Sequence, residues 1–247
     1  MARIYKENEI KLIKEGGKRL AQIIKKLTLE VREGKSAKEV EQTSRELYKK
    51  AGGSPSFLNY RGFPKAICVS VNEEVVHTVP GNRKFKKGDV VSIDAGLKYK
   101  GFHTDMAVTI PVGQISKEKE EFLKTCKKAL YDTIKIIKPG VSLGIIGYNI
   151  ENIVKKKGFS VIKELTGHGI GRQLHEPPSI LNYGKKGKGE TLKKGMVMAI
   201  EPIISMGGSE ITNIDKYWKI VTRDKSLSCH FEHTLSITDK GALILTK

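Results

Sequence analysis

An internal repeat constrains the fold of this 247-residue sequence more than any other feature. The motif Gly34-Lys-Ser36 begins a helical pattern that ends at Gly52, and Gly140-Val-Ser142 begins a second pattern that ends at Gly158. The copies are 106 residues apart at both ends, from 34 to 140 and from 52 to 158. In each copy the serine is a predicted helix N-cap and the last glycine a predicted helix stop. A longer helical pattern precedes each copy, over about residues 7–27 and 117–137.

The repeat continues into two pairs of acidic residues. Asp94 and Glu201 each end an apolar run that is typical of a strand, six residues after a glycine. The segment Phe102-His-Thr-Asp105 then resembles Cys229-His-Phe-Glu232. The spacing differs, because Asp94 and Asp105 are 11 residues apart whereas Glu201 and Glu232 are 31 apart. We therefore expect a loop about 20 residues longer in the second half, an insertion that costs little in chain entropy.

A pair of histidines completes the repeat. His77-Thr-Val-Pro80 corresponds to His175-Glu-Pro-Pro178. One such pair could be chance similarity between two α+β segments, but four pairs in the same order favour a duplication. The sequence thus predicts an α+β fold with pseudo-twofold halves, roughly 1–112 and 113–247, in a single domain over 1–247. Antiparallel strands from both halves would join across the middle, where the paired acids converge.

The four acids and one histidine are candidate metal ligands. Acids within buried strands are unfavourable unless they are neutralised, and four together repel one another unless cations hold them. The alternative, acids at separate strand ends facing solvent, suits any single one better than the set. His168 lies between glycines in Thr166-Gly-His168-Gly-Ile-Gly171, and a phosphate-binding loop is excluded there because no Lys-Ser or Lys-Thr follows. Oxygen ligands with one imidazole suit Mn²⁺, Fe²⁺, Co²⁺ or Zn²⁺.

This pattern predicts hydrolysis. Four carboxylates can bridge two ions, which lower the pKa of a bound water and polarise a carbonyl. His77 and His175 are not needed as ligands, so they are candidate proton or hydrogen-bond donors to the substrate carbonyl. The alternative for each is an ordinary surface or core histidine.

At this point the chain resembles type I methionine aminopeptidases of the pita-bread fold, over essentially its whole length. The matching segments are Val69-Ser-Val-Asn72-Glu-Glu-Val-Val-His77, Ile93-Asp94 with Asp105, Gly167-His168-Gly-Ile-Gly171 with His175, Ile200-Glu201-Pro202, and Phe231-Glu232-His233-Thr234. The order Asp, Asp, His, Glu, Glu is shared with prolidase and aminopeptidase P. A type II enzyme is disfavoured, because the last two glutamates are too close for its helical insertion.

The resemblance implies a fold and a set of roles. The fold would be a central curved antiparallel sheet covered by helices. Two divalent ions, Co, Mn, Fe or Zn, would bind Asp94, Asp105, His168, Glu201 and Glu232, with Asp105 and Glu232 bridging both. Glu201 would also help to deprotonate the attacking water. His77 would contact the substrate near the scissile peptide, and His175 would bind the carbonyl oxygen as negative charge develops.

The same resemblance implies a methionine pocket lined by Tyr60, Phe63, Cys68 and Trp218. Aromatic and thiol side chains suit a thioether, although they would serve equally well in a core. A shallow site for the next residue would limit cleavage to small second residues. Thr78 and Thr104 stand where the family commonly has glycine, and either could reshape the pocket entrance.

Composition bears on compartment and partners. Basic residues number 45 and acidic ones 27, a net charge of +18. Only 8 of the cations are Arg, the residue favoured for bidentate phosphate binding, so we interpret the charge mainly as a lysine-rich surface. The N-terminus has no signal-type apolar segment, and no run approaches the roughly 18 apolar residues of a membrane helix. Three dispersed cysteines indicate a reducing compartment.

We therefore expect a cytoplasmic, monomeric enzyme that removes initiator methionine from nascent chains, with no membrane and no specific DNA partner. A basic exterior would favour transient docking on ribosomal RNA. Two alternatives are a non-catalytic pita-bread protein that binds RNA or ribosomes, and a proline-specific peptidase of the same fold. The complete ligand set disfavours the first, and the absence of room for a large additional N-terminal domain disfavours the second. Cys126 and Cys229 receive no functional role.

Overall fold

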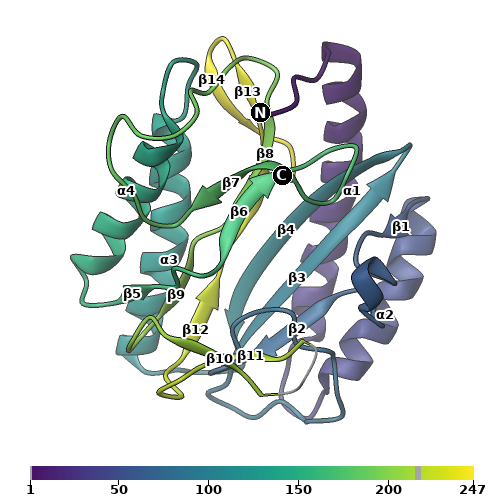
Figure 1. The fold of residues 1–247 in the computed structure, drawn as a ribbon. Coiled ribbons are helices and arrows are strands. Elements are labelled where there is room, and N and C mark those ends of the chain that lie inside the picture. The colour runs from purple at the N-terminus through teal and green to yellow at the C-terminus, as the bar shows by residue number, and fades with distance from the viewer. Residues whose placement is uncertain (1, 215–217) are drawn as a thin grey trace.

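The computed structural model describes residues 2–214 and 218–247, and it shows two similar halves side by side (Figure 1). The first half contains α1 (Glu7–Glu30), α2 (Ala37–Ala51), β1 (Ser54–Pro55), the 3₁₀ turn η1 (Tyr60–Gly62), β2 (Cys68–Val71), β3 (Val90–Tyr99) and β4 (Phe102–Pro111). The second contains α3 (Lys117–Ile136), α4 (Leu143–Lys155), β5 (Ser160–Val161), β6 (Thr166–Gly169), β7 (Glu176–Leu181), β8 (Val197–Ile200), β9 (Ile203–Ser205), β10 (Ile211–Asn213), β11 (Ile220–Thr222), β12 (Ser228–His230), β13 (His233–Thr238) and β14 (Gly241–Ile244).

The helices of the first half follow the predicted pattern closely. The apolar face of α1 is buried and packs against β3 and β4. Ser36 caps α2: its Oγ accepts a hydrogen bond from the Glu39 backbone N at 3.3 Å, and the Glu39 carboxylate accepts one from the Ser36 N at 2.9 Å. Gly52 ends α2 in the left-handed conformation at φ +68°, which glycine adopts without steric cost. The predicted cap and stop of this copy are therefore confirmed.

The second copy of the repeat has the same order of helices but differs at the start and the end of α4. Ser142 is the N-cap position of α4, yet its Oγ makes no cap bond and instead accepts from the Gly187 N at 3.1 Å. The Gly144 N donates to the Lys188 carbonyl at 2.8 Å, so a loop takes over part of the capping. Helix α4 ends at Lys155, earlier than predicted, and Gly158 takes its left-handed conformation in the turn beyond.

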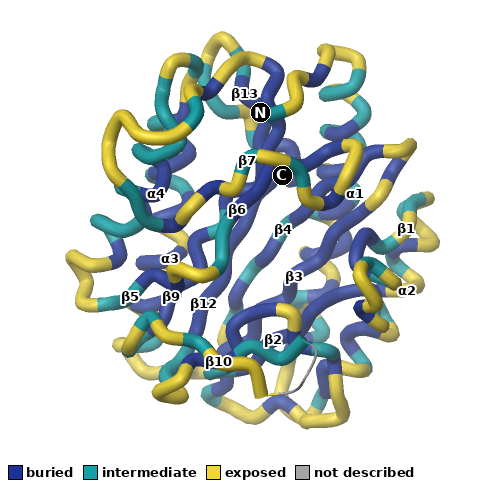
Figure 2. The backbone as a smooth tube through the Cα atoms, in the orientation of Figure 1, coloured by how far each residue is buried: buried dark blue, intermediate teal, exposed yellow. Residues whose placement is uncertain are grey.

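The strands form a continuous antiparallel surface across both halves. One sheet has the order β1-β3-β2 with β4 beside β3, and the other has the order β14-β13-β8-β6-β7. They meet at β4, where Thr234 Oγ1 donates to the Asp105 carbonyl at 2.8 Å and the Glu232 N donates to the Ala107 carbonyl at 2.9 Å. The helices lie behind the strands, and the strands themselves are largely buried (Figures 1 and 2). The predicted α+β fold, joined across the middle, is confirmed.

The interval between the acids differs between the halves as expected. In the first half, β3 and β4 pair along their full length and a tight turn connects them. In the second half, the longer interval forms β9 to β12, which pair as a β10-β11 hairpin and a β12-β9-β5 sheet. The extra residues are thus additional strand pairs rather than a plain loop. No helix in the described part of the chain is both long and apolar enough to span a membrane.

Candidate active site

Two adjacent strands of the first half carry Asp94 and Asp105. Asp94 lies in β3 opposite Ala107, and Asp105 lies in β4 opposite Gly96. Side chains of directly paired residues lie on the same face of a sheet, and residues two apart on a strand share a face. Both carboxyls therefore point to one side of the sheet.

The second half brings three more side chains to that side. His168 lies in β6 opposite Ala199 of β8, and Glu201 follows Ala199 by two residues, so both share a face. Glu232 lies between β12 and β13, where its backbone bond to β4 fixes it beside the strand of Asp105. All five predicted ligands line one cavity of about 540 Å³.

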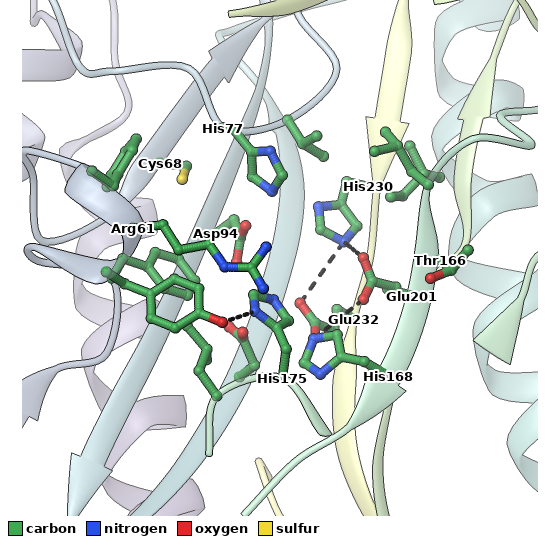
Figure 3. A pocket seen from close by; sticks show the side chains of 18 of the residues that line it. Arg61, Cys68, His77, Asp94, Thr166, His168, His175, Glu201, His230 and Glu232 are labelled. Atoms are coloured by element: carbon green, nitrogen blue, oxygen red, sulfur yellow. Dashed lines mark hydrogen bonds and ion pairs between the residues drawn. The ribbon is translucent and has the colours of Figure 1, made fainter. Parts of the chain in front are cut away.

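The ligand atoms in this cavity are close together. Single ligand atoms of Asp105, His168 and Glu232 all lie within 4.8 Å of one another. The Nε2 of His168 is 3.6 Å from Oε1 of Glu201. Figure 3 shows Glu201, Glu232 and His168 facing one another on one side of the cavity, with Asp94 across from them.

Burial dominates the electrostatics of the acids. It raises the pKa of Asp94 to about 7, while a hydrogen bond with Asp105 lowers it. The pKa values of Asp105, Glu201 and Glu232 are raised well above the usual range, first by burial and then by the charge of neighbouring acids. Without a cation, burial and mutual repulsion therefore favour the protonated form of these groups over the charged form.

The site has the properties expected of a metal centre. Oδ1 of Asp94 and Oε1 of Glu232 are buried without a hydrogen-bond partner among the described residues. Buried polar atoms are normally paired, so two unpaired ligand oxygens in one cavity indicate a missing partner. Burial lowers the pKa of His168 to about 4, which leaves its imidazole neutral and available as a ligand. The oxygen-rich donor set fits Mn²⁺, Fe²⁺, Co²⁺ or Zn²⁺.

The two histidines predicted to contact substrate lie in the same cavity (Figure 3). The Nδ1 of His175 is hydrogen-bonded to the Tyr60 hydroxyl at 2.8 Å, and its ring lies 4.4 Å from that of His168. Burial, followed by electrostatic interaction with the His168 and His77 imidazoles and with Arg61, lowers the pKa of His175 to about 3, so it is neutral near pH 7. Burial also lowers the pKa of His77, whose backbone has φ +58°. A non-glycine residue in that conformation is strained, a feature common at functional sites.

The four predicted pocket residues are also brought together. Tyr60, Phe63, Cys68 and Trp218 line the cavity that contains the acids. The rings of Phe63 and Trp218 meet edge to face with centroids 5.3 Å apart. Cys68 is paired with Asp94 across β2 and β3, which places its thiol next to the acids. The sequence did not predict the bond from Tyr60 to His175, which gives Tyr60 a second contact beyond the pocket wall.

Thr104 lies away from the pocket. It precedes Asp105 on β4 and therefore points to the opposite face, where its Oγ1 donates to the Leu97 carbonyl at 3.4 Å. It lies beside Gly16 of α1. The expectation that Thr104 could reshape the pocket entrance is wrong, because strand alternation turns its side chain toward the helix.

Several lining residues were missed by the sequence analysis, and two of them, Arg61 and His230, lie beside the predicted site residues. Arg61, in the η1 turn at φ +49°, reaches over the cavity in Figure 3. His230, two residues before Glu232, faces Glu201 and Glu232. A signal for His230 existed: on a strand, a residue two positions from a ligand shares its face.

Comparisons with known proteins agree with this geometry. Residues 11–239 match the family described as Metallopeptidase family M24. Methionine aminopeptidase 1 of Bacillus subtilis (strain 168) is 43% identical over 239 residues, which cover 97% of this chain and 96% of the relative. A methionine aminopeptidase of Clostridium perfringens (strain 13 / Type A) is 40% identical over 240 residues, 97% of this chain and 96% of the relative.

Solved structures show the same fold. A crystal structure of methionine aminopeptidase from Thermotoga maritima matches with a TM-score of 0.98 at 44% identity, covering all of both chains. A prolidase from Pyrococcus furiosus matches with a TM-score of 0.80 at 25% identity, covering 99% of this chain but 65% of the prolidase. The full-length correspondence to methionine aminopeptidases contrasts with the partial one to prolidase.

Proposed function

The chain belongs to metallopeptidase family M24, and we propose that Asp94, Asp105, His168, Glu201 and Glu232 hold two divalent metal ions at its active site. The convergence of all five in one buried cavity supports this assignment. Asp105 and Glu232 lie where the two sheets meet, which suits them to contact both ions. Co, Mn, Fe and Zn remain the candidate metals.

The protein is a metal-dependent exopeptidase that removes N-terminal methionine. Full-length similarity to methionine aminopeptidases carries this conclusion. Its substrates are the N-termini of nascent polypeptides. The two alternatives raised by the sequence fit less well. A protein that only binds RNA does not need a buried metal site. The prolidase match covers 65% of the prolidase, whereas the methionine aminopeptidase from Thermotoga maritima matches over its full length.

The side chains of the cavity have separate roles in the reaction. Divalent ions bound here supply a Lewis acid that polarises the scissile carbonyl and lowers the pKa of the attacking water. Glu201 takes the proton from that water. The Tyr60 O–H donates to His175 Nδ1, which leaves Nε2–H of His175 to donate to the carbonyl oxygen as its negative charge grows. His77 contacts the substrate near the scissile peptide.

The methionine side chain occupies the part of the cavity lined by Tyr60, Phe63, Cys68 and Trp218. The edge-to-face pair of Phe63 and Trp218 supports this placement, since sulfur contacts at aromatic rings are favourable. We further propose that only small second residues are accepted. Rates on Met-Ala and Met-Leu peptides test this point, and equal rates would contradict it.

The proposed function is tested with purified protein, added Mn²⁺, Co²⁺ or Fe²⁺, and peptides of the forms Met-Ala-x and x-Pro. We expect methionine release from the first and no cleavage of the second. His175→Ala should lower kcat by roughly 100-fold or more, as for loss of one oxyanion donor, and leave metal content unchanged. No release with any metal, from a folded protein, would refute the function. Collapse of the metal content in His175→Ala would refute the role of that residue.

The number of ions is a separate question. Titration with metal, followed by elemental analysis of the protein, should give two ions per chain. Saturation at one ion, with full activity, would overturn the dinuclear assignment but leave the peptidase function intact.

Transient docking on the ribosome is the final element of the proposal. Asp94, Asp105 and Glu232 are buried and Glu201 is 11% exposed, so the positive excess of the chain lies mainly on the outer surface. Such a surface attracts the phosphates of ribosomal RNA. Co-sedimentation with ribosomes should weaken steeply as salt rises. If no co-sedimentation occurs even at low salt, the positive charge reflects a lysine-rich composition and the proposed docking is refuted.

A further inference from the structure

His230 is an unassigned histidine at the centre of the acid cluster. It ends β12, and its side chain is 2% exposed. Its Nε2 lies 3.6 Å from Oε2 of Glu201 and 3.8 Å from Oε2 of Glu232. That nitrogen has no hydrogen-bond partner among residues 2–214 and 218–247. Figure 3 shows the imidazole facing these two glutamates from above.

Glu201 lies between two imidazoles. Its Oε1 is 3.6 Å from Nε2 of His168, and its Oε2 is 3.6 Å from Nε2 of His230. His168 approaches the oxygen on the side where the proposed metal ligands gather. A carboxylate that binds an ion through one oxygen is usually held by a hydrogen-bond donor at the other. Of the two imidazoles, His230 is the one that faces the second oxygen.

We propose that His230 is a positioning residue of the metal centre: its Nε2 faces Oε2 of Glu201 at 3.6 Å, and its N–H donates to that oxygen once the carboxylate binds metal, which fixes the orientation of the carboxylate. This inference rests on the proposed metal-binding function of the same cavity. His230 thereby keeps Glu201 aligned both as a ligand and as the acceptor of the water's proton. Because Glu232 is nearly as close, the same N–H restrains that carboxylate as well.

The repeat contains a natural control for this residue. His103 precedes Asp105 by two positions, as His230 precedes Glu232. In the first half, however, Nδ1 of His103 is hydrogen-bonded to Ser56 Oγ at 2.9 Å. It lines a separate, shallow pocket beside β1 rather than the acid cavity. His103 is thus held by a hydrogen bond to Ser56, whereas His230 faces the acids.

The first test is the affinity for Mn²⁺, measured by calorimetry on His230→Leu, His230→Gln and the matched control His103→Gln. Loss of a contact to a metal ligand typically weakens metal binding about 10–100-fold, which is the expectation for His230→Leu. His230→Gln keeps an N–H donor and should restore most of the affinity, while His103→Gln should bind as the wild type. Equal affinities in the wild type and His230→Leu would overturn the proposal.

The second test is made on the wild-type protein and uses a variant for assignment alone. In wild-type protein labelled with ¹⁵N-histidine and loaded with diamagnetic Zn²⁺, the Nε2 resonance of His230 should show a directly bonded proton. The resonance is assigned by its disappearance in His230→Gln. An unprotonated Nε2 with a metal-shifted resonance would make His230 a ligand, and an unprotonated, unshifted one would make it a bystander; either result overturns the proposal.

These readouts are independent of peptide cleavage. If the protein binds metal with the expected dependence on His230 but releases no methionine, the proposed function fails and the positioning role stands. If methionine is released normally while His230→Leu binds Mn²⁺ as tightly as the wild type, the positioning role fails alone.

Discussion

The two halves of the molecule share a plan but contribute unequally to the site. The first half supplies two aspartates on a pair of strands that are hydrogen-bonded over ten residues each. The second supplies two glutamates and three histidines from short strands and the segments beside them, with an inserted set of strands between the glutamates. The first half therefore provides a long, regular strand pair that carries the aspartates, and the second half provides the glutamate and histidine side chains.

The difference is clearest at the position of His168. His168 is paired with Ala199, and the repeat aligns Ala199 with Ser92, which is paired with Ser70. Ser70 thus stands where His168 stands in the other half. The repeat explains why four acids converge, but it does not explain the nitrogen ligand, which belongs to the second half alone. The repeated pattern therefore accounts for the acids, and the imidazole is present in only one of the two copies.

The largest expected effect comes from removing charge where the halves meet. Asp105→Asn and Glu232→Gln should each lower methionine release by more than about 100-fold, the upper range for a residue that only contacts a ligand. Metal content should fall in parallel. Asp239→Asn, which removes an exposed carboxylate paired with Lys194, is the control for net charge. If only one of the two variants loses metal, the halves are not equivalent at their junction.

Metal addition should stabilise the protein by an amount that depends on pH. In the ion-free protein the buried acids bind protons more tightly than in the unfolded chain, so their ionisation removes stability as pH rises through about 7, the pKa of Asp94. Protons also compete with metal for these oxygens. The gain in Tm on adding Mn²⁺ should therefore be larger at about pH 8 than at about pH 5.5. At 1,000-fold excess over Kd, the free energy of unfolding should rise by about 4 kcal/mol.

That comparison has its own control. In Asp105→Asn the gain in Tm should be small at both pH values, because the shared carboxylate is missing. A gain that is equal at the two pH values in the wild type would show that the acids are not protonated in the ion-free protein.

A smaller effect is expected where α1 of the first half packs against the C-terminal segment of the second. A Cβ on Gly17 would lie 2.3 Å from the carbonyl oxygen of Leu245, so Gly17→Ala must push the two segments apart. We expect a loss of about 1–3 kcal/mol in the free energy of unfolding, as for an overpacked core. Gly16→Ala is the matched control, since its Cβ would meet the Cβ of Tyr99 at 3.3 Å. Urea denaturation of both variants measures the difference.

Gly16→Ala should stay within about 1 kcal/mol of the wild type, because the gain in helix propensity offsets the tight contact. Equal destabilisation by both substitutions would mean that helix packing against β3, rather than the junction of the halves, limits stability at this point.

The sequence predicted what depends on local pattern. The caps of α2, the acids at strand positions and the duplication all follow from periodicity and spacing, and the structure places them as expected. Two kinds of feature escaped it. The left-handed backbone at His77 and Arg61 depends on tertiary packing, because few non-glycine residues adopt it. The hydrogen bond from Tyr60 to His175 joins residues 115 positions apart, and such distant pairs are set by the fold.

His230 is a different case, because the pattern was present but not used. Alignment of Cys229-His with Phe102-His drew attention to the acids two positions later and not to the histidines. Only the three-dimensional arrangement shows that Nε2 of His230 faces Glu201 while Nδ1 of His103 is bonded to Ser56. Equivalent positions in the repeat thus predict where the two histidines lie in their halves. The hydrogen-bond partners of each histidine decide what it does there.

The smallest expected effect separates the two halves at their matched helix starts. Ser36 both accepts from the Glu39 N and donates to the Glu39 carboxylate at 2.7 Å, whereas Ser142 accepts only from the Gly187 N of a distant loop. Loss of a true N-cap costs about 1 kcal/mol, so Ser36→Ala should lower the free energy of unfolding by that amount. Ser142→Ala should cost less, because its Oγ makes no cap bond and α4 keeps the bond from Gly144 N to the Lys188 carbonyl. The two midpoints in urea, compared at unchanged m-value, measure the difference. Equal losses would show that the second copy retains a working cap, and the divergence between the halves would then be confined to the active site.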